Sequence, residues 1–220
     1  MNHELQLYSL ATPNGQKVGI ALEEMGLPYQ AHTINIMSGD QFKPAFIKMN
    51  PNSKIPVLVD LDGPQGQPLS IMESGAILIY LAQKSGKFWS AAPRHQSEIL
   101  QWLFFQVGGV GPMFGQFGHF FKHAKDKCDH PYPLERYTNE TKRILAVLDD
   151  HLAGKDYLVA SQYTIADMAT VPWINGLSVF YQADEKLELS KFRNVNAWVE
   201  RVLAKPKTAA GMNVCKIEMK

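Results

Sequence analysis

The segment 50–74 constrains the fold more than any other part of this chain of 220 residues. Near its start, Ile55-Pro56 precedes the short apolar run 57–60. Near its end, the apolar run 69–72 stops abruptly at Glu73-Ser74, and a helical pattern follows at once. A proline cannot donate to a sheet ladder, so Pro56 is predicted at the start of a strand or in a special turn.

These two ends have complementary binding properties. If the Ile55-Pro56 peptide bond is cis, the N–H and C=O of Ile55 turn outward, toward an extended peptide. Glu73 offers a carboxylate for an ammonium, and the helix that begins at Ser74 offers unsatisfied N–H groups for a carboxylate. The segment therefore predicts a socket for a short zwitterionic peptide.

Hydrophobic periodicity predicts the element order βαβαββα over the first eighty-odd residues. The expected strands cover 5–9, 29–36, 57–60 and 69–72, and the expected helices run over 13–25, 42–48 and 74–84. Gly26 and Pro28 mark the end of the first helix, and 63–66 connects the last two strands as a hairpin.

The remainder of the chain reads as helical. A linker is predicted over 85–94, and a long helix around Trp102 should be kinked or broken by the glycines and proline of 108–112. Thr164 and Asp167 have the spacing of a capping box before an apolar run, which predicts a structural helix start without a chemical role. The segment 205–220 has no predicted position.

Composition excludes several classes of partner. The chain has 22 basic and 21 acidic residues, a balance that predicts neither nucleic acid nor an anionic membrane as a partner. No apolar run approaches the roughly 20 residues of a membrane span, and the first residues lack the pattern of a secretion signal. Cys128 and Cys215 stand in no Cys-x-x-Cys or metal-like spacing, which favours a reducing compartment, the cytoplasm.

The run Lys54–Val57, followed by Glu73–Leu81, resembles the glutathione site of the cytosolic glutathione S-transferase superfamily. The resemblance extends over essentially the whole chain. It implies an α/β plus all-α protein: an N-terminal thioredoxin-like βαβαββα domain over 1–86 and an all-helical C-terminal domain over 93–220. A thioredoxin-like domain needs a cis proline before its third strand, so we expect the Ile55-Pro56 bond to be cis.

Within the superfamily, the chain is most similar to the Nu class, the bacterial disulfide-bond oxidoreductases that have fungal nitrogen-regulator relatives. The motifs that carry this similarity are Thr12–Gly15, Ser38–Phe42, Asn50–Pro56 and Gln101–Met113. The similarity implies a homodimer that binds two glutathiones or one glutathione disulfide in each site. Its expected partners are small thiols and disulfides, with glutathione as the bound co-substrate and no metal.

Matching positions to the class pattern assigns roles to particular residues. Thr12 and Asn14 would be catalytic and face the sulfurs; Asn14, Gln41, Lys54, Ile55, Glu73 and Ser74 would bind the first glutathione; and Arg136 would reach a carboxylate of the second. Glutathione disulfide carries four carboxylates and two ammoniums, so this excess of cationic groups suits it. Asn-Ser-Lys at 52–54, where relatives have Asn-Asn-Lys, and the hairpin 62–66 depart from the pattern.

The loop 8–15 contains no cysteine, so a mixed disulfide with the protein is not expected. Tyr8 and Ser9 are rival thiol activators, although Tyr8 follows the strand alternation and should point into the sheet packing. Bound glutathione can supply the thiols for disulfide exchange, and the two cysteines of the chain are expected to be inert. Two alternatives remain: a conventional transferase that conjugates glutathione to electrophiles, and a non-catalytic glutathione-binding regulator.

Three histidines could suggest a metal site. His119 and His123 lie four residues apart with His130 nearby, but they lack an acidic partner at the spacing of a zinc motif. We therefore expect no metal centre, and we interpret these side chains as part of a pocket wall or of the surface.

Overall fold

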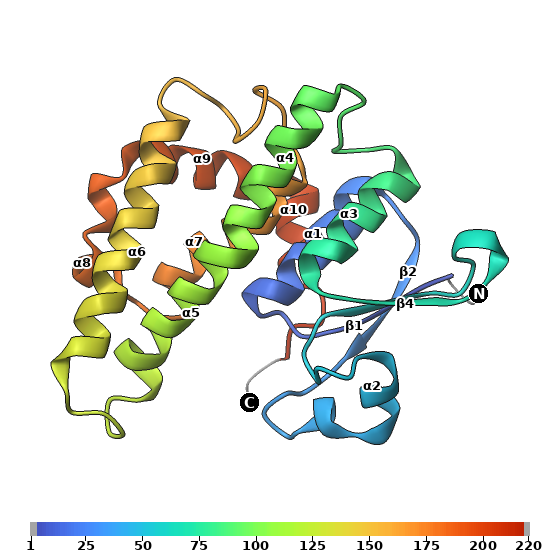
Figure 1. Cartoon of the computed structure of the whole chain (residues 1–220), viewed down its shortest axis with the longest axis horizontal. Helices are drawn as coiled ribbons and strands as arrows, with labels where there is room; N and C mark the ends of the chain where they lie inside the picture. Colours follow the sequence, from blue (N-terminus) through green and yellow to red (C-terminus); the bar gives the residue numbers. More distant parts are fainter. Residues whose placement is uncertain (1–3, 218–220) are drawn as a thin grey trace. The chain divides into compact units, whose positions relative to one another are not determined.

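The computed structural model describes residues 4–217 of the chain (Figure 1). The chain forms two compact units, one made of the segment up to Trp89 together with the segment from Lys205, the other of Ser90–Ala204. The prediction gave everything after residue 92 to the second domain. The structure differs at the C-terminal end, because the segment from Lys205 packs within the first unit.

The first unit contains a four-stranded sheet in the order β2-β1-β3-β4. Its strands are β1 (Leu5–Ser9), β2 (Tyr29–Thr33), β3 (Val57–Asp60) and β4 (Leu69–Met72). β1 and β2 are parallel, whereas the β1–β3 and β3–β4 pairs are antiparallel. β2 is shorter than predicted because the chain turns at Asn35, whose N–H donates to Asp40 Oδ2 at 2.9 Å and whose carbonyl accepts from the N–H of Ser38 at 3.2 Å.

Helices lie on both faces of this sheet (Figure 1). One face carries α1 (Pro13–Met25) and α3 (Ser74–Ser85), and the other carries the short helices η1 (Asp40–Phe42) and α2 (Pro44–Met49). A 3₁₀ turn, η2 (Pro64–Gly66), connects β3 to β4. The core consists of fully buried apolar residues from strands and helices, among them Leu7, Val18, Ile20, Leu58 and Leu78.

The last helix, α10 (Pro206–Gly211), packs against α1 in the same unit. Two glycines permit the close approach: a Cβ on Gly19 would lie 2.4 Å from the carbonyl oxygen of Gly211. Polar contacts fix the register, since Thr208 Oγ1 donates to Glu24 Oε1 at 2.7 Å. The side chain of Gln16 also donates to the carbonyl of Met212 at 3.1 Å. These contacts explain why the C-terminal segment joins the first unit.

The second unit is helical, as predicted. It comprises α4 (Pro93–Phe105), η3 (Gln106–Val110), α5 (Gly111–Gly118), η4 (His119–His123), α6 (Pro131–Leu152), α7 (Ile165–Val179), α8 (Asp184–Leu187), η5 (Leu189–Lys191) and α9 (Arg193–Leu203). The predicted interruption at 108–112 takes the form of a π-helical turn, η3, that leads directly into α5. A π turn shifts the hydrogen-bond pattern by one residue, so the helix tolerates Pro112 without a loop.

The predicted capping box at the start of α7 is confirmed. The N–H of Thr164 donates to Asp167 Oδ2 at 2.9 Å, and the N–H of Ala166 donates to Thr164 Oγ1 at 3.3 Å. Asp167 is fully buried, and its Oδ1 also accepts from the indole of Trp198 at 2.9 Å. The box therefore ties α7 to α9 in the core of the second unit. Across residues 4–217, no helix combines the length and apolar character needed to cross a membrane.

Candidate functional site

Strand register brings four predicted site segments to one end of the sheet. Ser9 at the end of β1 is aligned with Thr33 at the end of the parallel strand β2, so the loops that follow both strands begin together. Tyr8 is opposite Val57, which begins β3 directly after Ile55-Pro56. Val57 is in turn opposite Met72, the residue before Glu73-Ser74. Residues separated by up to about sixty positions in sequence therefore meet at this edge.

The loop after β1 presents Thr12 and Asn14 at the start of α1. Thr12 is the N-cap residue with an extended backbone, but within the described chain its side chain makes no capping hydrogen bond. Asn14 is half-buried in the first turn of the helix. Gly15 lets the loop pass very close to the helix, because a Cβ there would lie 1.9 Å from the carbonyl oxygen of Leu10. The hydroxyl of Thr12 is thus not consumed by helix capping.

The two rival thiol activators occupy other environments. Ser9 is only 1% exposed, and its hydroxyl donates to the carbonyl of Leu10 at 3.4 Å on the side of the strand that faces Gly15. Tyr8 directly precedes Ser9 in the strand and therefore faces the opposite side of the sheet, where its ring stacks on His32. Compared with Ser9 and Tyr8, Thr12 and Asn14 at the start of α1 are therefore better placed to face a bound thiol.

The Ile55-Pro56 peptide bond is cis, as predicted. Within residues 4–217, neither the N–H nor the C=O of Ile55 takes part in a hydrogen bond, so both are available to an extended ligand. Asn50, a residue that the sequence analysis missed, organises this loop. It is 2% exposed, and its Nδ2 donates to the carbonyl of Lys54 at 2.7 Å while its Oδ1 accepts from the N–H of Asn52 at 2.9 Å. The side chain of Lys54 itself is exposed.

Glu73 and Ser74 form an open helix start. Glu73 has a φ of 70°, a left-handed value that non-glycine residues adopt rarely and that is often found at binding sites. Its carbonyl accepts the first helical hydrogen bond, from the N–H of Ile77 at 2.9 Å, and its side chain is exposed. No side chain of the described residues caps α3. The first N–H groups of α3 are therefore free of intrahelical partners and can bind an anion.

The structure adds Lys17, which was not predicted as a site residue. Lys17 lies on α1, is 1% exposed, and its Nζ donates to Ser74 Oγ at 3.2 Å. Burial lowers the pKa of Lys17 to about 7, although the nearby charge of Glu73 acts in the opposite direction. The sequence held one signal: Lys17 is three and four residues before Ile20 and Ala21 and so extends the buried stripe of this helix.

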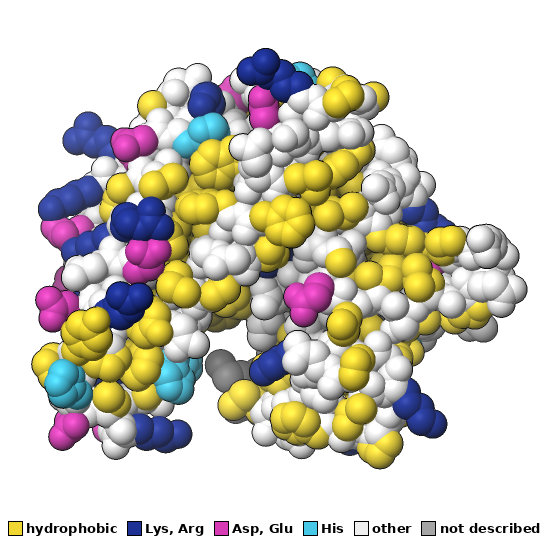
Figure 2. Space-filling model, in the orientation of Figure 1, with side chains coloured by type: hydrophobic (Ala, Val, Ile, Leu, Met, Phe, Trp, Pro, Cys, Tyr) yellow, Lys and Arg dark blue, Asp and Glu magenta, His cyan; other side chains and the backbone are white. Residues whose placement is uncertain are grey.

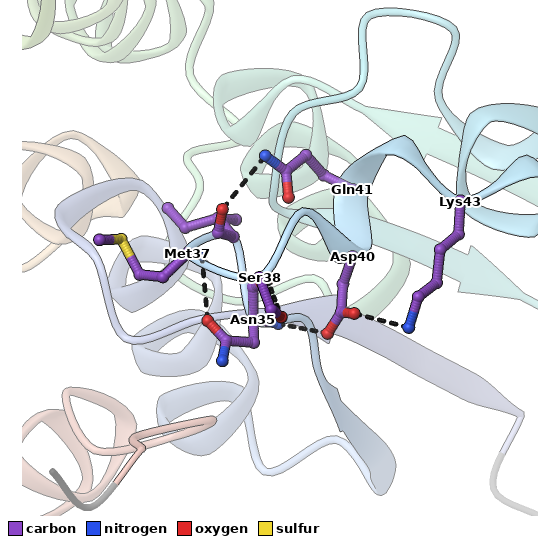
Figure 3. Close-up of polar contacts among 7 residues, drawn as sticks. Asn35, Met37, Ser38, Asp40, Gln41 and Lys43 are labelled. Carbon is purple, nitrogen blue, oxygen red and sulfur yellow. Dashed lines mark hydrogen bonds and ion pairs between the residues drawn. The ribbon is translucent and has the colours of Figure 1, made fainter.

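Gln41 belongs to a loop that is folded by its own polar side chains (Figure 3). The carboxylate of Asp40 accepts from the N–H of Asn35 and pairs with Lys43 Nζ at 2.6 Å, and the hydrogen bond from Lys43 keeps the pKa of Asp40 below its usual value. Gln41 Nε2 donates to the carbonyl of Ile36 at 3.3 Å. Gln41 Oε1 is buried, and the described residues provide it with no donor. The Oε1 atom of Gln41 can therefore accept a hydrogen bond from a ligand.

Arg136 belongs to the second unit, where it is exposed on α6. It is the one predicted site residue outside the first unit. Its assigned role toward a second glutathione stays a prediction from the class pattern.

Neither cysteine belongs to the loop after β1, but Cys215 packs against this loop, because its carbonyl accepts from the N–H of Ala11 at 3.3 Å. Cys128 and Cys215 are both unpaired and half-buried. Burial raises the pKa of the Cys215 thiol, which lowers its thiolate fraction at neutral pH. Within the described part of the chain, no group of three or more His, Cys, Asp or Glu side chains could hold a metal ion.

Comparisons with known proteins identify the family of both domains. Residues 11–84 match the glutathione S-transferase N-terminal domain, and residues 110–206 match the glutathione S-transferase C-terminal domain. The chain is 42% identical over 211 residues to the disulfide-bond oxidoreductase YfcG of Escherichia coli, with 94% of each chain covered.

Solved structures are similar as well. A glutathione transferase family member from Pseudomonas fluorescens with two glutathiones bound superposes with a TM-score of 0.94 at 48% identity, over 96% of this chain and 93% of that one. A glutathione transferase from Pseudomonas putida, with one glutathione disulfide bound per subunit, gives a TM-score of 0.93 at 46% identity, over 96% and 91% of the two chains. With both domains matched and relatives this similar over nearly the whole length, the chain belongs to the glutathione S-transferase family.

Proposed function

We propose that this protein is an enzyme that reduces small disulfides with glutathione and uses no cysteine of its own. The observation that carries the proposal is the strand register, which brings the loop after β1, the cis Ile55-Pro56 bond and the open start of α3 to one edge of the sheet. The activity named for the YfcG relative, and the two glutathiones or one glutathione disulfide bound in similar structures, support it.

The chemistry requires two glutathione thiolates. The first attacks one sulfur of the disulfide RSSR, forms the mixed disulfide between glutathione and R, and releases RS⁻. The second attacks the glutathione sulfur of that mixed disulfide, forms glutathione disulfide and releases the other RS⁻. The two protons lost by the glutathione thiols end on the two released thiolates. The net reaction is two glutathiones plus RSSR to glutathione disulfide plus two RSH.

The protein contributes orientation and electrostatics to this exchange. Thr12 and Asn14 would donate hydrogen bonds to sulfur, and the N-terminus of α1 adds a favourable partial charge, so both the attacking and the leaving thiolate would be stabilised. Holding two thiols and a disulfide in one site also raises their effective concentration. These two contributions explain how exchange can be accelerated without a protein thiol.

Glutathione matches the binding groups along the edge. Its γ-glutamyl end carries an ammonium and a carboxylate on one carbon, which suits Glu73 beside the N–H groups of α3. Its cysteinyl amide would pair with the backbone of Ile55, as an added strand pairs with a sheet edge. Lys54 and Gln41 would serve the glycine end, where the leftover acceptor Gln41 Oε1 can receive an amide N–H. Arg136 would reach a carboxylate of the second glutathione.

The test is calorimetric titration with reduced and oxidised glutathione, together with an assay of hydroxyethyl disulfide reduction. We expect two reduced molecules or one disulfide per subunit, and turnover that requires glutathione. One reduced molecule per subunit, with turnover of an electrophile such as 1-chloro-2,4-dinitrobenzene in place of the disulfide, would instead identify a conventional transferase. Binding of glutathione without turnover of either substrate would identify a glutathione-binding regulator.

We also propose that the protein is a homodimer. Several large apolar side chains of the first unit are exposed, including Met37 at 88% and Phe42 at 65%, and Figure 2 shows hydrophobic side chains on the surface of the molecule. Exposed apolar groups of this size are common where subunits associate. Light scattering coupled to size-exclusion chromatography tests the proposal, and a mass of about 24.7 kDa, that of one chain, would contradict it.

The reaction requires a supply of reduced glutathione, so we infer a reducing compartment such as the cytoplasm. The two unpaired cysteines agree with that location. Fractionation of the source cells, with the protein detected by an antibody, would test it.

A further inference from the structure

A buried lysine contacts the helix start at which the γ-glutamyl end of glutathione is proposed to bind. This lysine belongs to another helix, α1. Lys17 comes from α1, yet its ammonium reaches the first residue of α3, where Nζ is 3.2 Å from Ser74 Oγ. Both residues are buried, Lys17 at 1% and Ser74 at 7% exposure. The contact thus joins α1, whose start carries Thr12 and Asn14, to the start of α3, where the γ-glutamyl carboxylate is proposed to bind.

If this contact only held the two helices together, a buried lysine would lower the stability of the fold without a compensating role. Moving an ammonium out of water carries a large free-energy cost, and apolar residues of similar volume usually hold a helix pair at least as well. Burial lowers the pKa of Lys17 to about 7 although the charge of Glu73 acts in the opposite direction, so desolvation of the ammonium is the larger of the two effects. Such a cost is commonly found at functional sites.

The chemistry of the two groups gives the contact a direction. An ammonium can only donate hydrogen bonds, whereas a hydroxyl has one proton to donate and two lone pairs that accept. While Lys17 is charged, Ser74 Oγ is therefore the acceptor, and its single proton remains available for another acceptor. A neighbouring positive charge also polarises the hydroxyl and strengthens its own donation.

We propose that Lys17 is a positioning residue of the glutathione site, which holds the Ser74 hydroxyl with its proton toward the γ-glutamyl carboxylate at the start of α3. This inference rests on the proposed binding of glutathione at that helix start. Lys17 acts through Ser74 and contacts neither sulfur. Its effect is therefore confined to binding of the end of glutathione that carries both the ammonium and the carboxylate.

The experiment compares two ligands and three substitutions. The ligands are glutathione and 4-aminobutyryl-cysteinylglycine, which keeps the terminal ammonium but lacks the γ-glutamyl carboxylate. The substitutions are Lys17→Met, which removes the charge at similar volume, Lys17→Arg, which keeps a cationic donor, and Lys87→Met as the matched control. Lys87 is an exposed lysine that also donates to the first unit, to the carbonyl of Met25 at 2.6 Å, at the opposite end of α1.

We expect Lys17→Met to weaken glutathione binding about tenfold or more, the usual effect of losing a charge-assisted contact. Binding of the truncated ligand should change by less than about twofold, since that ligand has no carboxylate for Ser74 to meet. Lys17→Arg should recover part of the loss, and Lys87→Met should bind both ligands as the wild type does. The KM for glutathione should rise with little change in kcat, because the lost contact is made equally before and during the reaction.

A uniform loss for both ligands, accompanied by a lower thermal midpoint, would show that Lys17 is only structural and would overturn the inference. Unchanged glutathione affinity in Lys17→Met would overturn it too. If the methionine variant does not fold, Ser74→Ala provides the same comparison, and equal losses for the two ligands there would overturn it. Failure of the proposed function is distinct: the wild type would then either not bind glutathione at all or bind it without reducing hydroxyethyl disulfide.

Discussion

The rings of Tyr8 and His32 stack across the parallel pair β1–β2, with centroids 4.5 Å apart and planes inclined by 13°. His32 is held in turn by Gln6, whose Oε1 is 2.7 Å from His32 Nε2. Ser9 lies on the face of the sheet toward Gly15, at the start of α1. The stacked ring of Tyr8 lies on the opposite face. A tyrosine that activates the thiol would have to lie with Thr12 and Asn14 at the helix start.

The position of Tyr8 predicts that its hydroxyl has no catalytic role. We expect Tyr8→Phe to leave kcat/KM for disulfide reduction within about twofold of the wild type, since the ring and its stacking are retained. Steady-state assays with glutathione and hydroxyethyl disulfide provide the measurement. A loss of about a hundredfold would mean that the tyrosine activates sulfur after all.

Asn14 is predicted to stabilise the thiolate. Asn14→Ala should lower kcat/KM by about 100-fold, the lower end of the usual cost of removing a donor to developing negative charge. Asn14→Asp should be more harmful, because a carboxylate in the same place raises the pKa of the bound thiol. The thiolate absorbance of bound glutathione, followed against pH, measures that pKa. Thr12→Val serves as the comparison, and equal activity of all three variants and the wild type would contradict the assigned roles.

The two cysteines are predicted to be dispensable. Cys128→Ser and Cys215→Ser together should retain disulfide reductase activity within about twofold, because burial raises the pKa of Cys215, the cysteine that packs against the loop after β1, and so keeps its thiolate fraction low. The double variant is assayed beside the wild type at matched glutathione concentration. Loss of reductase activity in a variant that still binds glutathione would show that a protein thiol takes part.

Stability should depend on pH through Lys17. Its pKa is lowered from 10.5 to about 7 in the folded state, so above pH 7 the unfolded chain binds more protons than the folded one. Stability should therefore rise with pH from about 7 toward 10.5, by at most about 1.4 kcal/mol per pH unit. Urea denaturation of wild type and Lys17→Met at several pH values tests this, with a smaller slope expected in the variant. Parallel curves would assign the slope to other groups.

Asp167 is predicted to be a major stabilising residue of the second unit. Asp167→Ala would leave three buried N–H donors without an acceptor, those of Leu158, Thr164 and Trp198. We expect a loss of about 3 kcal/mol or more in the free energy of unfolding. Asp156→Ala, which removes an exposed ion pair with Arg201, is the matched control and should cost less than about 1 kcal/mol. Chemical denaturation that gives similar values for both would contradict this role.

Much of the fold could be predicted because its signals are local. Alternation of apolar residues identified the strands, and the capping pair Thr164 and Asp167 identified the start of α7. The cis bond at Ile55-Pro56 could be expected as well, because the resemblance implied a thioredoxin-like domain, which needs a cis proline at this position. The motifs around Pro56 and Glu73 also led to the family. The strand and capping inferences depend on residues within a few positions of one another.

Contacts between distant segments could not be predicted in this way. Periodicity shows which side of a helix is buried but not against what it packs, so the position of α10 on α1 depended on the mutual fit of Gly19 and Gly211. The same limit applies to the strand end at Thr33, where the loop contact between Asn35 and Asp40 ended β2 early.

The sequence by itself determined the order of the elements and the residues that carry the glutathione motif, because propensity, turn chemistry and capping act within a few residues. The tertiary structure alone decided that Ser9 is buried and that Lys17 reaches Ser74. A lysine in a helix ordinarily faces water, and only the packing of α1 on α3 removes that water and supplies a hydroxyl in its place. The free energy of such a buried charge depends on its three-dimensional surroundings, which no local pattern encodes.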